Sequence, residues 1–170
     1  MMKVHVATEN GSLADKYGKQ ASEEYLRDGV PYVSFPISFE NVPENAKSLA
    51  LTLIDYDSVP VCNFAWIHWL VANIPAEVKE LPENASDEKP FPFVQGNTSY
   101  ASPVAGHKDP KITQQYGGPT PPDKDHDYTL VVYALDTELN LKDGYYLNEF
   151  YRAIEGHVIE EKTIAVVGRA

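Results

Sequence analysis

The stretch LALTLIDYDSVPVCNFAWIHWLVANIP, residues 49–75, decides the fold of this chain. It covers two near-continuously apolar runs, 48–54 and 65–74, which are joined by a polar segment too long for a tight hairpin. Apolar runs of this length are typical of strands that are buried on both faces. The centre of the fold is therefore expected to be a pair of buried strands with a functional loop between them.

Three other segments carry strand patterns, namely 1–10, 30–40 and 128–136. Helical spacing of apolar residues is confined to 147–158, and 158–167 is expected to be helix or a helix leading into a last strand. Strands thus come first and do not alternate with helices, which favours a single mainly β domain, 1–170, with antiparallel sheets and short peripheral, mostly C-terminal helices.

Prolines dominate the region between the second and third strong strands, residues 75–124. So much proline excludes a long helix and indicates an ordered loop. A loop of this length within one compact domain is usually functional or disordered, and its aromatic residues favour the functional interpretation.

The composition is that of a globular protein with a net charge of -11 and a pI near 4.8. No basic stripe is present, so nucleic acid and anionic membrane surfaces are excluded as expected partners. The single cysteine, Cys62, allows no internal disulfide. No apolar run approaches the roughly 20 residues needed to cross a bilayer. A cytoplasmic protein without integral membrane contact is expected.

Two aspartates and a histidine are the first candidate site residues. Asp55 and Asp57 lie at the end of the first apolar run. One of them could orient a histidine, the two together could hold a metal or share a proton, or both could simply form a turn. His68 lies in the second run and has the same strand parity as Trp66, so both should face one side. It is either a histidine satisfied inside the core or an imidazole that faces a ligand.

The segment 116–122, YGGPTPP, cannot form regular structure, and its glycine N–H groups could receive an anion or form a rigid turn. His126 follows it, just before a strand, where it either closes a pocket or lies exposed. Motifs of serine hydrolases, zinc sites, phosphate loops and dinucleotide folds are absent from the sequence, so no cofactor is expected. A metal held by Asp55, His68 and His126 stays open at this point.

Together these motifs resemble the phosphatidylethanolamine-binding protein family, also called the Raf kinase inhibitor protein family, and its bacterial branch in particular. The first family motif, Asp-Pro-Asp-x-Pro followed by a strand with a His-Trp or His-Phe pair, corresponds to DYDSVP at 55–60 and to His68 with Trp69. The second motif, Tyr-x-Gly-Pro-x-Pro-Pro followed by Gly-x-His-Arg-Tyr, corresponds to YGGPTPP and to DHDY at 125–128. The resemblance covers most of the chain from about residue 30.

The resemblance implies an antiparallel Greek-key fold, similar to a β-sandwich, with one large and one smaller sheet. It also implies a pocket for a phosphate or carboxylate headgroup. The ligand-binding residues would be Asp55, His68, Gly118 and His126. Asp57 would support the turn, and Trp66, Tyr116 and Pro119 would support the pocket.

One departure from the family pattern is that Asp127 stands where the family usually has arginine. If Asp127 lies at the pocket rim, its charge weakens the binding of an anion. The expected function is binding of a small anionic or zwitterionic ligand, with a regulatory protein partner as an added role. Two alternatives are a hydrolase that uses the Asp and His residues, and an inhibitor of a protease or kinase that uses an exposed loop. The family analogy also allows a homodimer.

Overall fold

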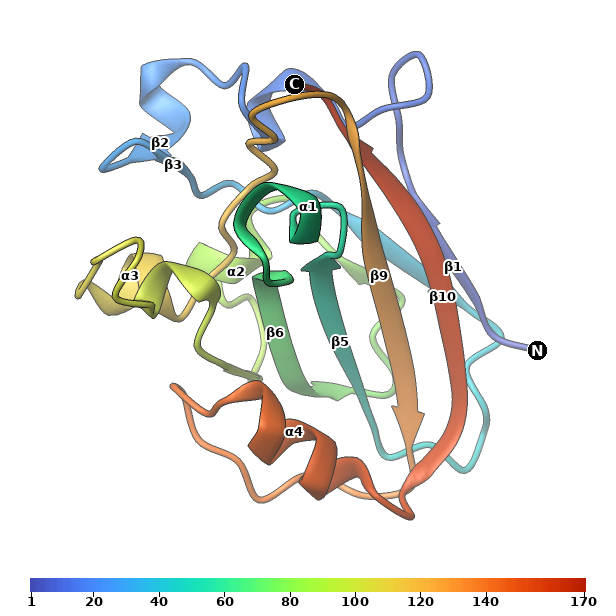
Figure 1. The fold of residues 1–170 in the computed structure, drawn as a ribbon. Helices are drawn as coiled ribbons and strands as arrows, with labels where there is room; N and C mark the ends of the chain where they lie inside the picture. The colour runs from blue at the N-terminus through green and yellow to red at the C-terminus, as the bar shows by residue number, and fades with distance from the viewer.

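Two antiparallel sheets form the body of the protein, and the computed structural model describes all residues, 1–170. The large sheet has the strand order β10-β9-β5-β6-β8, and the small sheet has the order β1-β4-β7. Figure 1 shows β10, β9, β5 and β6 side by side. The large sheet consists of β5 (Ser48–Asp55), β6 (Trp66–Pro75), β8 (Val94–Gln95), β9 (His126–Leu135) and β10 (Val158–Gly168). The small sheet consists of β1 (Lys3–Val6), β4 (Ile37–Glu40) and β7 (Glu80–Leu81). A separate pair, β2 (Leu26–Arg27) and β3 (Val30–Pro31), forms a short ribbon.

The large sheet has Greek-key connectivity, as expected. Strands β5, β6 and β8 are neighbours in the sheet and consecutive within it along the chain, and β9 then returns to lie beside β5. This is the spatial order that defines a Greek key. The long return from β8 to β9 carries the segment 96–125, so the proline-rich region is delivered to the end of the sheet where β9 begins (Figure 1).

The strand β5 is buried along its whole length because both faces of the large sheet are covered. On one face Leu49, Leu51 and Leu53 belong to the main core, which the small sheet completes with residues such as Ile37 and Phe39. On the other face Ala50 contributes to a second cluster. The predicted continuous burial of this strand is therefore confirmed, and its cause is a layer on each side.

The longest helix, α4 (Leu147–Ile154), covers the second face through Phe150 and Ile154, which are buried. It lies at the end of the sheet opposite to α1 (Val59–Cys62) (Figure 1). The other helices are single turns in loops, namely α2 (Ala85–Glu88), α3 (Pro110–Thr113) and three 3₁₀ turns at Asp15–Tyr17, Glu23–Tyr25 and Ser99–Ala101. None of these helices has the length and apolar character that a membrane span requires.

Two local predictions need correction. The segment 158–167, expected to be helix or a helix leading into a last strand, is strand throughout: it forms the edge strand β10, which pairs with β9 alone. Its charged run Glu160–Lys162 hid the strand pattern, and charged residues of this kind are common on sheet edges. The strand expected over 30–40 is divided into β3 and β4, in line with the prolines at positions 31 and 36.

Candidate functional site

Three neighbouring strands place their site residues in one row. In the register of the large sheet, Asp55 at the end of β5 lies opposite Trp66 on β6 and opposite Tyr128 on β9. Residues directly opposite each other in antiparallel pairs point to the same face. His126 lies two residues before Tyr128 on β9 and shares this face. The row thus brings together residues that are about 70 positions apart in the sequence.

A β-bulge adds His68 to this row. Leu53 pairs with Trp69 and the next residue, Ile54, pairs with Ile67, so His68 is the extra residue of β6. A bulge leaves one residue unpaired and redirects its side chain. His68 consequently lies on the pocket side together with Trp66, as the shared parity of these residues predicted.

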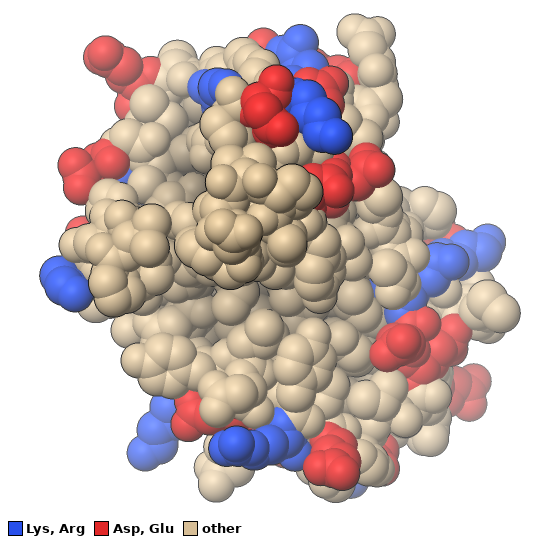
Figure 2. All heavy atoms as spheres, in the orientation of Figure 1, with Lys and Arg blue, Asp and Glu red and all other residues tan.

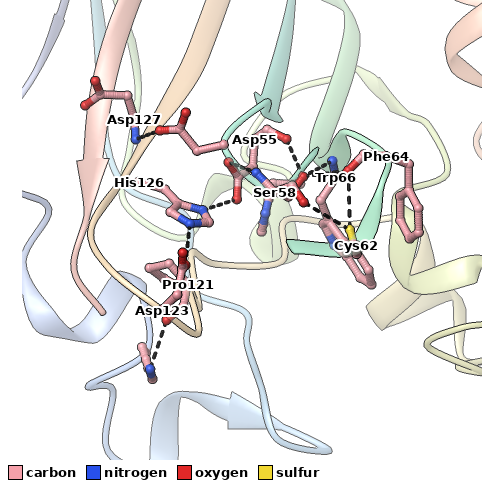
Figure 3. Close-up of polar contacts among 12 residues, drawn as sticks. Asp55, Ser58, Cys62, Phe64, Trp66, Pro121, Asp123, His126 and Asp127 are labelled. Carbon is pink, nitrogen blue, oxygen red and sulfur yellow. Dashed lines mark hydrogen bonds and ion pairs between the residues drawn. The ribbon is translucent and has the colours of Figure 1, made fainter. Parts of the chain in front are cut away.

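The turn after β5 fixes the Asp55 carboxylate. Asp55 Oδ1 accepts a hydrogen bond of 3.1 Å from the backbone N–H of Ser58. The Ser58 hydroxyl oxygen lies 2.7 Å from the Asp55 carbonyl oxygen and accepts 3.0 Å from the Trp66 N–H. Ser58 therefore ties the end of β5 to the start of β6 and holds Asp55 in one orientation (Figure 3).

These residues surround a pocket of about 280 Å³. The remaining lining residues come from the β5–β6 turn, the 3₁₀ turn near residue 100 and the proline-rich loop: Ser58, Val61, Cys62, Tyr100, Thr120, Pro121 and Pro122. No lysine or arginine lines the pocket. Figure 2 shows charged side chains around the edge of the face that carries α1, with an uncharged centre.

His126 is held between two carboxylates. Its Nδ1 lies 2.7 Å from Asp55 Oδ2 and its Nε2 lies 2.9 Å from Asp123 Oδ1 (Figure 3). Ionised carboxylates only accept hydrogen bonds, so both ring nitrogens carry hydrogen and the ring is a cation. Burial lowers the pKa of His126, but the hydrogen bonds and charges of Asp55 and Asp123 outweigh burial and leave the pKa raised. The pair of Asp55 with His126 is almost fully buried, with 3% and 1% exposure.

Removal of the Asp123 side chain is expected to lower the pKa of His126, because the imidazolium loses one of its two carboxylates. Asp123→Ala and Asp127→Ala remove the same charge from exposed positions close in sequence, but only Asp123 contacts the ring. NMR titration of the His126 ring protons measures both variants. Equal His126 pKa values in the two variants would show that the contact with Asp123 has no influence.

His68 has the opposite electrostatic behaviour. Burial lowers its pKa to about 4, and this outweighs the backbone carbonyl of Gly117 and the charge of Asp55, which both favour the cation. His126 adds repulsion. His68 is therefore neutral at neutral pH. The two histidines of one pocket thus differ in charge because only one of them touches carboxylates.

The depressed pKa of His68 predicts a loss of stability in acid. Between about pH 6.5 and 4 His68 binds a proton in the unfolded chain but not in the folded protein. The contribution of His68 to the free energy of unfolding is therefore fully present above this window and is lost as the pH falls through it. The loss approaches about 3 kcal/mol at the acid end. Urea unfolding of wild type and His68→Gln at about pH 7 and 4 measures it, since glutamine keeps a donor but does not titrate. The same pH dependence in both proteins would refute this assignment.

The backbone N–H groups of the glycines in the segment 116–122 do not point into the pocket as expected. The N–H of Gly117 donates to the His68 carbonyl at 3.0 Å, and the N–H of Gly118 donates to the Pro31 carbonyl at 2.8 Å. Gly118 does not line the pocket, so the expectation that its N–H faces a ligand is wrong. A side chain at Gly118 would lie 2.2 Å from the Tyr17 carbonyl oxygen. This glycine permits close backbone packing behind the pocket.

The other expected supporting residues have different roles. Tyr116 is buried behind the pocket, where its hydroxyl donates to the Tyr17 carbonyl at 2.7 Å. Pro119 is also buried and does not line the pocket. Asp57 supports the turn, because its carboxylate accepts a 2.9 Å hydrogen bond from the Asp127 N–H.

Asp127 does not lie at the rim of the pocket, and this expectation is corrected. It is exposed, and its carboxylate points away from His126 (Figure 3). The reason is strand alternation, because His126 and Tyr128 are buried on one face of β9 and Asp127 points to the other. The exposed acidic residue that does contact His126 is Asp123.

Tyr100, Thr120 and Tyr128 are pocket residues that the sequence did not reveal. A signal was available for Tyr128, since it follows His126 by two positions in a strand. No signal was available for Tyr100, which is brought to His68 by the long loop, with ring centroids 6.3 Å apart. No group of three or more His, Cys, Asp or Glu residues is arranged to hold a metal ion.

The sequence profile of the family described as phosphatidylethanolamine-binding protein matches residues 3–169. The chain belongs to the phosphatidylethanolamine-binding protein family. A member from Bacillus subtilis, described as uncharacterized protein YxkA, is 56% identical over 168 residues and covers 99% of both chains. A protein described as UPF0098 from Methanothermobacter thermautotrophicus is 34% identical, covering 94% of this chain and 92% of its own.

Solved structures agree with membership of the phosphatidylethanolamine-binding protein family. A putative family homologue from Chlamydia trachomatis, CT736, superposes with a TM-score of 0.77 at 29% identity, over 99% of this chain and 97% of its own. YbcL of E. coli, described as a new member of the mammalian family, reaches a TM-score of 0.77 at 24% identity, over 99% and 98%. At this identity YbcL supports the fold alone. The fold expected from the motifs is therefore confirmed.

Proposed function

We propose that this protein binds a small zwitterionic or anionic molecule in the pocket at the ends of β5, β6 and β9. The observation that carries the proposal is the buried ion pair of Asp55 and His126, which borders an open cavity. A buried ion pair is expensive to desolvate, and hydrophobic residues of similar volume often stabilise a core equally well. The pocket of about 280 Å³ has room for a headgroup or another small metabolite.

The lining residues offer both polar and apolar recognition. Tyr100, Thr120 and Tyr128 carry hydroxyl groups that can donate to a phosphate or carboxylate oxygen. Trp66, Tyr100 and Tyr128 provide aromatic surface, which also attracts an ammonium group. Because no lysine or arginine lines the pocket, a molecule with low net charge suits it better than a multiply charged anion.

The arrangement supports binding better than acid–base catalysis. Both ring nitrogens of His126 are engaged by carboxylates, so this ring has no free position for accepting a proton. His68 Nδ1 is engaged by the Gly117 carbonyl at 2.6 Å, and burial lowers the pKa of the ring to about 4, so its free Nε2 is a weak base at neutral pH. A general base works best when its pKa lies near the operating pH. We therefore propose a binding protein rather than a hydrolase.

Isothermal titration calorimetry with phosphoethanolamine tests the proposal. Tyr128→Phe removes one hydroxyl from the pocket and is expected to weaken binding about tenfold. Tyr146→Phe is the matched control, because Tyr146 is exposed on the far side of the sheet at the start of α4 and should bind like wild type. An absence of measurable binding by the wild type, or equal weakening by both variants, would contradict the proposal.

A further inference from the structure

The tautomer of His68 is fixed by a backbone carbonyl. Its Nδ1 lies 2.6 Å from the Gly117 carbonyl oxygen, and the Gly117 N–H returns a bond to the His68 carbonyl at 3.0 Å. A carbonyl oxygen only accepts hydrogen bonds, so the hydrogen of a neutral His68 must be on Nδ1. The second ring nitrogen, Nε2, then has a lone pair and no hydrogen.

The surroundings of His68 keep the ring neutral. The residue is 3% exposed, and the rings of Tyr100 and Tyr128 pack against it in T-shaped arrangements. The charged groups that face it are Asp55 on β5, which favours the cationic form of His68, and the cationic ring of His126 on β9, which opposes it. Burial therefore decides the protonation state, and it favours the neutral form.

Nε2 of His68 has no hydrogen-bond partner in the protein. The only hydrogen bond of the His68 side chain is the one made by Nδ1. Nε2 is not fully occluded by the protein. Since His68 lines the pocket, Nε2 opens into it. Asp55, whose oxygens accept from Ser58 and His126, lies at the same end. The inner end of the pocket thus presents hydrogen-bond acceptors.

We infer that the inner end of the ligand is a hydrogen-bond donor, an N–H or O–H group that binds His68 Nε2. This inference rests on the proposed function and specifies its ligand. A fully deprotonated phosphate would set bare oxygen atoms against bare acceptors, which leaves buried polar groups unpaired. A phosphate monoester that retains one acidic proton satisfies the requirement, and so does an ammonium group.

Two pairs of probes distinguish the two candidate donors, the acidic O–H of a phosphate monoester and the N–H of an ammonium group. Methyl phosphate at about pH 5 and dimethyl phosphate are both monoanions, but only the first carries an O–H group. Methylammonium and tetramethylammonium are both monocations, but only the first carries N–H groups. In the pair that matches the natural ligand, the probe with a donor should bind at least about tenfold more tightly. If methyl phosphate is the binder, its affinity should fall about tenfold per pH unit above its second pKa of about 6, while dimethyl phosphate stays unchanged.

Nitrogen-15 NMR of His68 gives a readout that is independent of probe size. Nε2 should have the resonance of an unprotonated ring nitrogen at about pH 7, and the bound donor should shift it toward the hydrogen-bonded position. Protonated Nε2 in the free protein, or equal binding within both pairs of probes, overturns the inference and leaves the proposed function intact. Binding of none of the four probes or of phosphoethanolamine overturns the proposed function, and the inference with it.

Discussion

Replacement of Asp55 by alanine is expected to lower the free energy of unfolding by about 4 kcal/mol, because it leaves a buried cation without its buried partner. Asp55 and His126 are 3% and 1% exposed and lie 2.7 Å apart. The substitution also leaves the Ser58 N–H without its acceptor, in the turn that joins β5 to β6. Urea unfolding at about pH 6, where His126 is charged, measures the effect.

Asp57→Ala is the matched control for this substitution. Asp57 is exposed, and its carboxylate makes one hydrogen bond with the Asp127 N–H at the surface. The control should cost about 1 kcal/mol or less. If Asp55→Ala and Asp57→Ala lower the free energy of unfolding equally, the buried pair of Asp55 and His126 does not stabilise the fold by the expected amount.

Replacement of Gly118 by alanine is expected to lower the free energy of unfolding by about 3 kcal/mol. The added methyl group would lie 2.2 Å from the Tyr17 carbonyl oxygen and 2.7 Å from the Pro31 side chain, and a backbone carbonyl cannot move aside as a flexible side chain does. Displacement of Gly118 also disturbs Gly117, which holds His68 by two hydrogen bonds. Ligand affinity should therefore fall together with stability.

Gly106→Ala separates this clash from the general cost of losing a glycine. Gly106 has a φ of +75° and no atom within 4 Å of an added Cβ, so only backbone strain opposes the substitution. We expect a cost of about 1 kcal/mol, measured by the same urea titration. A Gly118→Ala protein that is as stable as Gly106→Ala would mean that the loop relaxes without difficulty.

The central strands could be predicted because continuous apolar runs in the local sequence indicate their burial. Runs 48–54, 65–74 and 128–136 are apolar and became β5, β6 and β9. The edge strand β10 could not be predicted with the same ease, because it pairs on one side only and carries Glu160, Glu161 and Lys162. Its strand state is decided by pairing with β9, which is a long-range contact.

The site could be predicted only where its residues belong to local motifs. Asp55, His68 and His126 stand in recognisable motifs, and the structure brings them together. The family resemblance implies a ligand contact for Gly118, and a glycine permits close backbone approach, but the sequence does not say which group approaches. The contacts of Tyr100 and Asp123 depend on how the segment 96–125 folds back, and no local pattern encodes that path.

A crystal structure determined in the presence of phosphoethanolamine tests the central claim most directly. The account predicts electron density in the pocket between His68, Tyr100 and Tyr128, with a donor atom of the ligand within hydrogen-bond distance of His68 Nε2 and with the pair of Asp55 and His126 intact. Density for the ligand only at another surface, or a pocket filled solely by water at saturating ligand concentration, would contradict it.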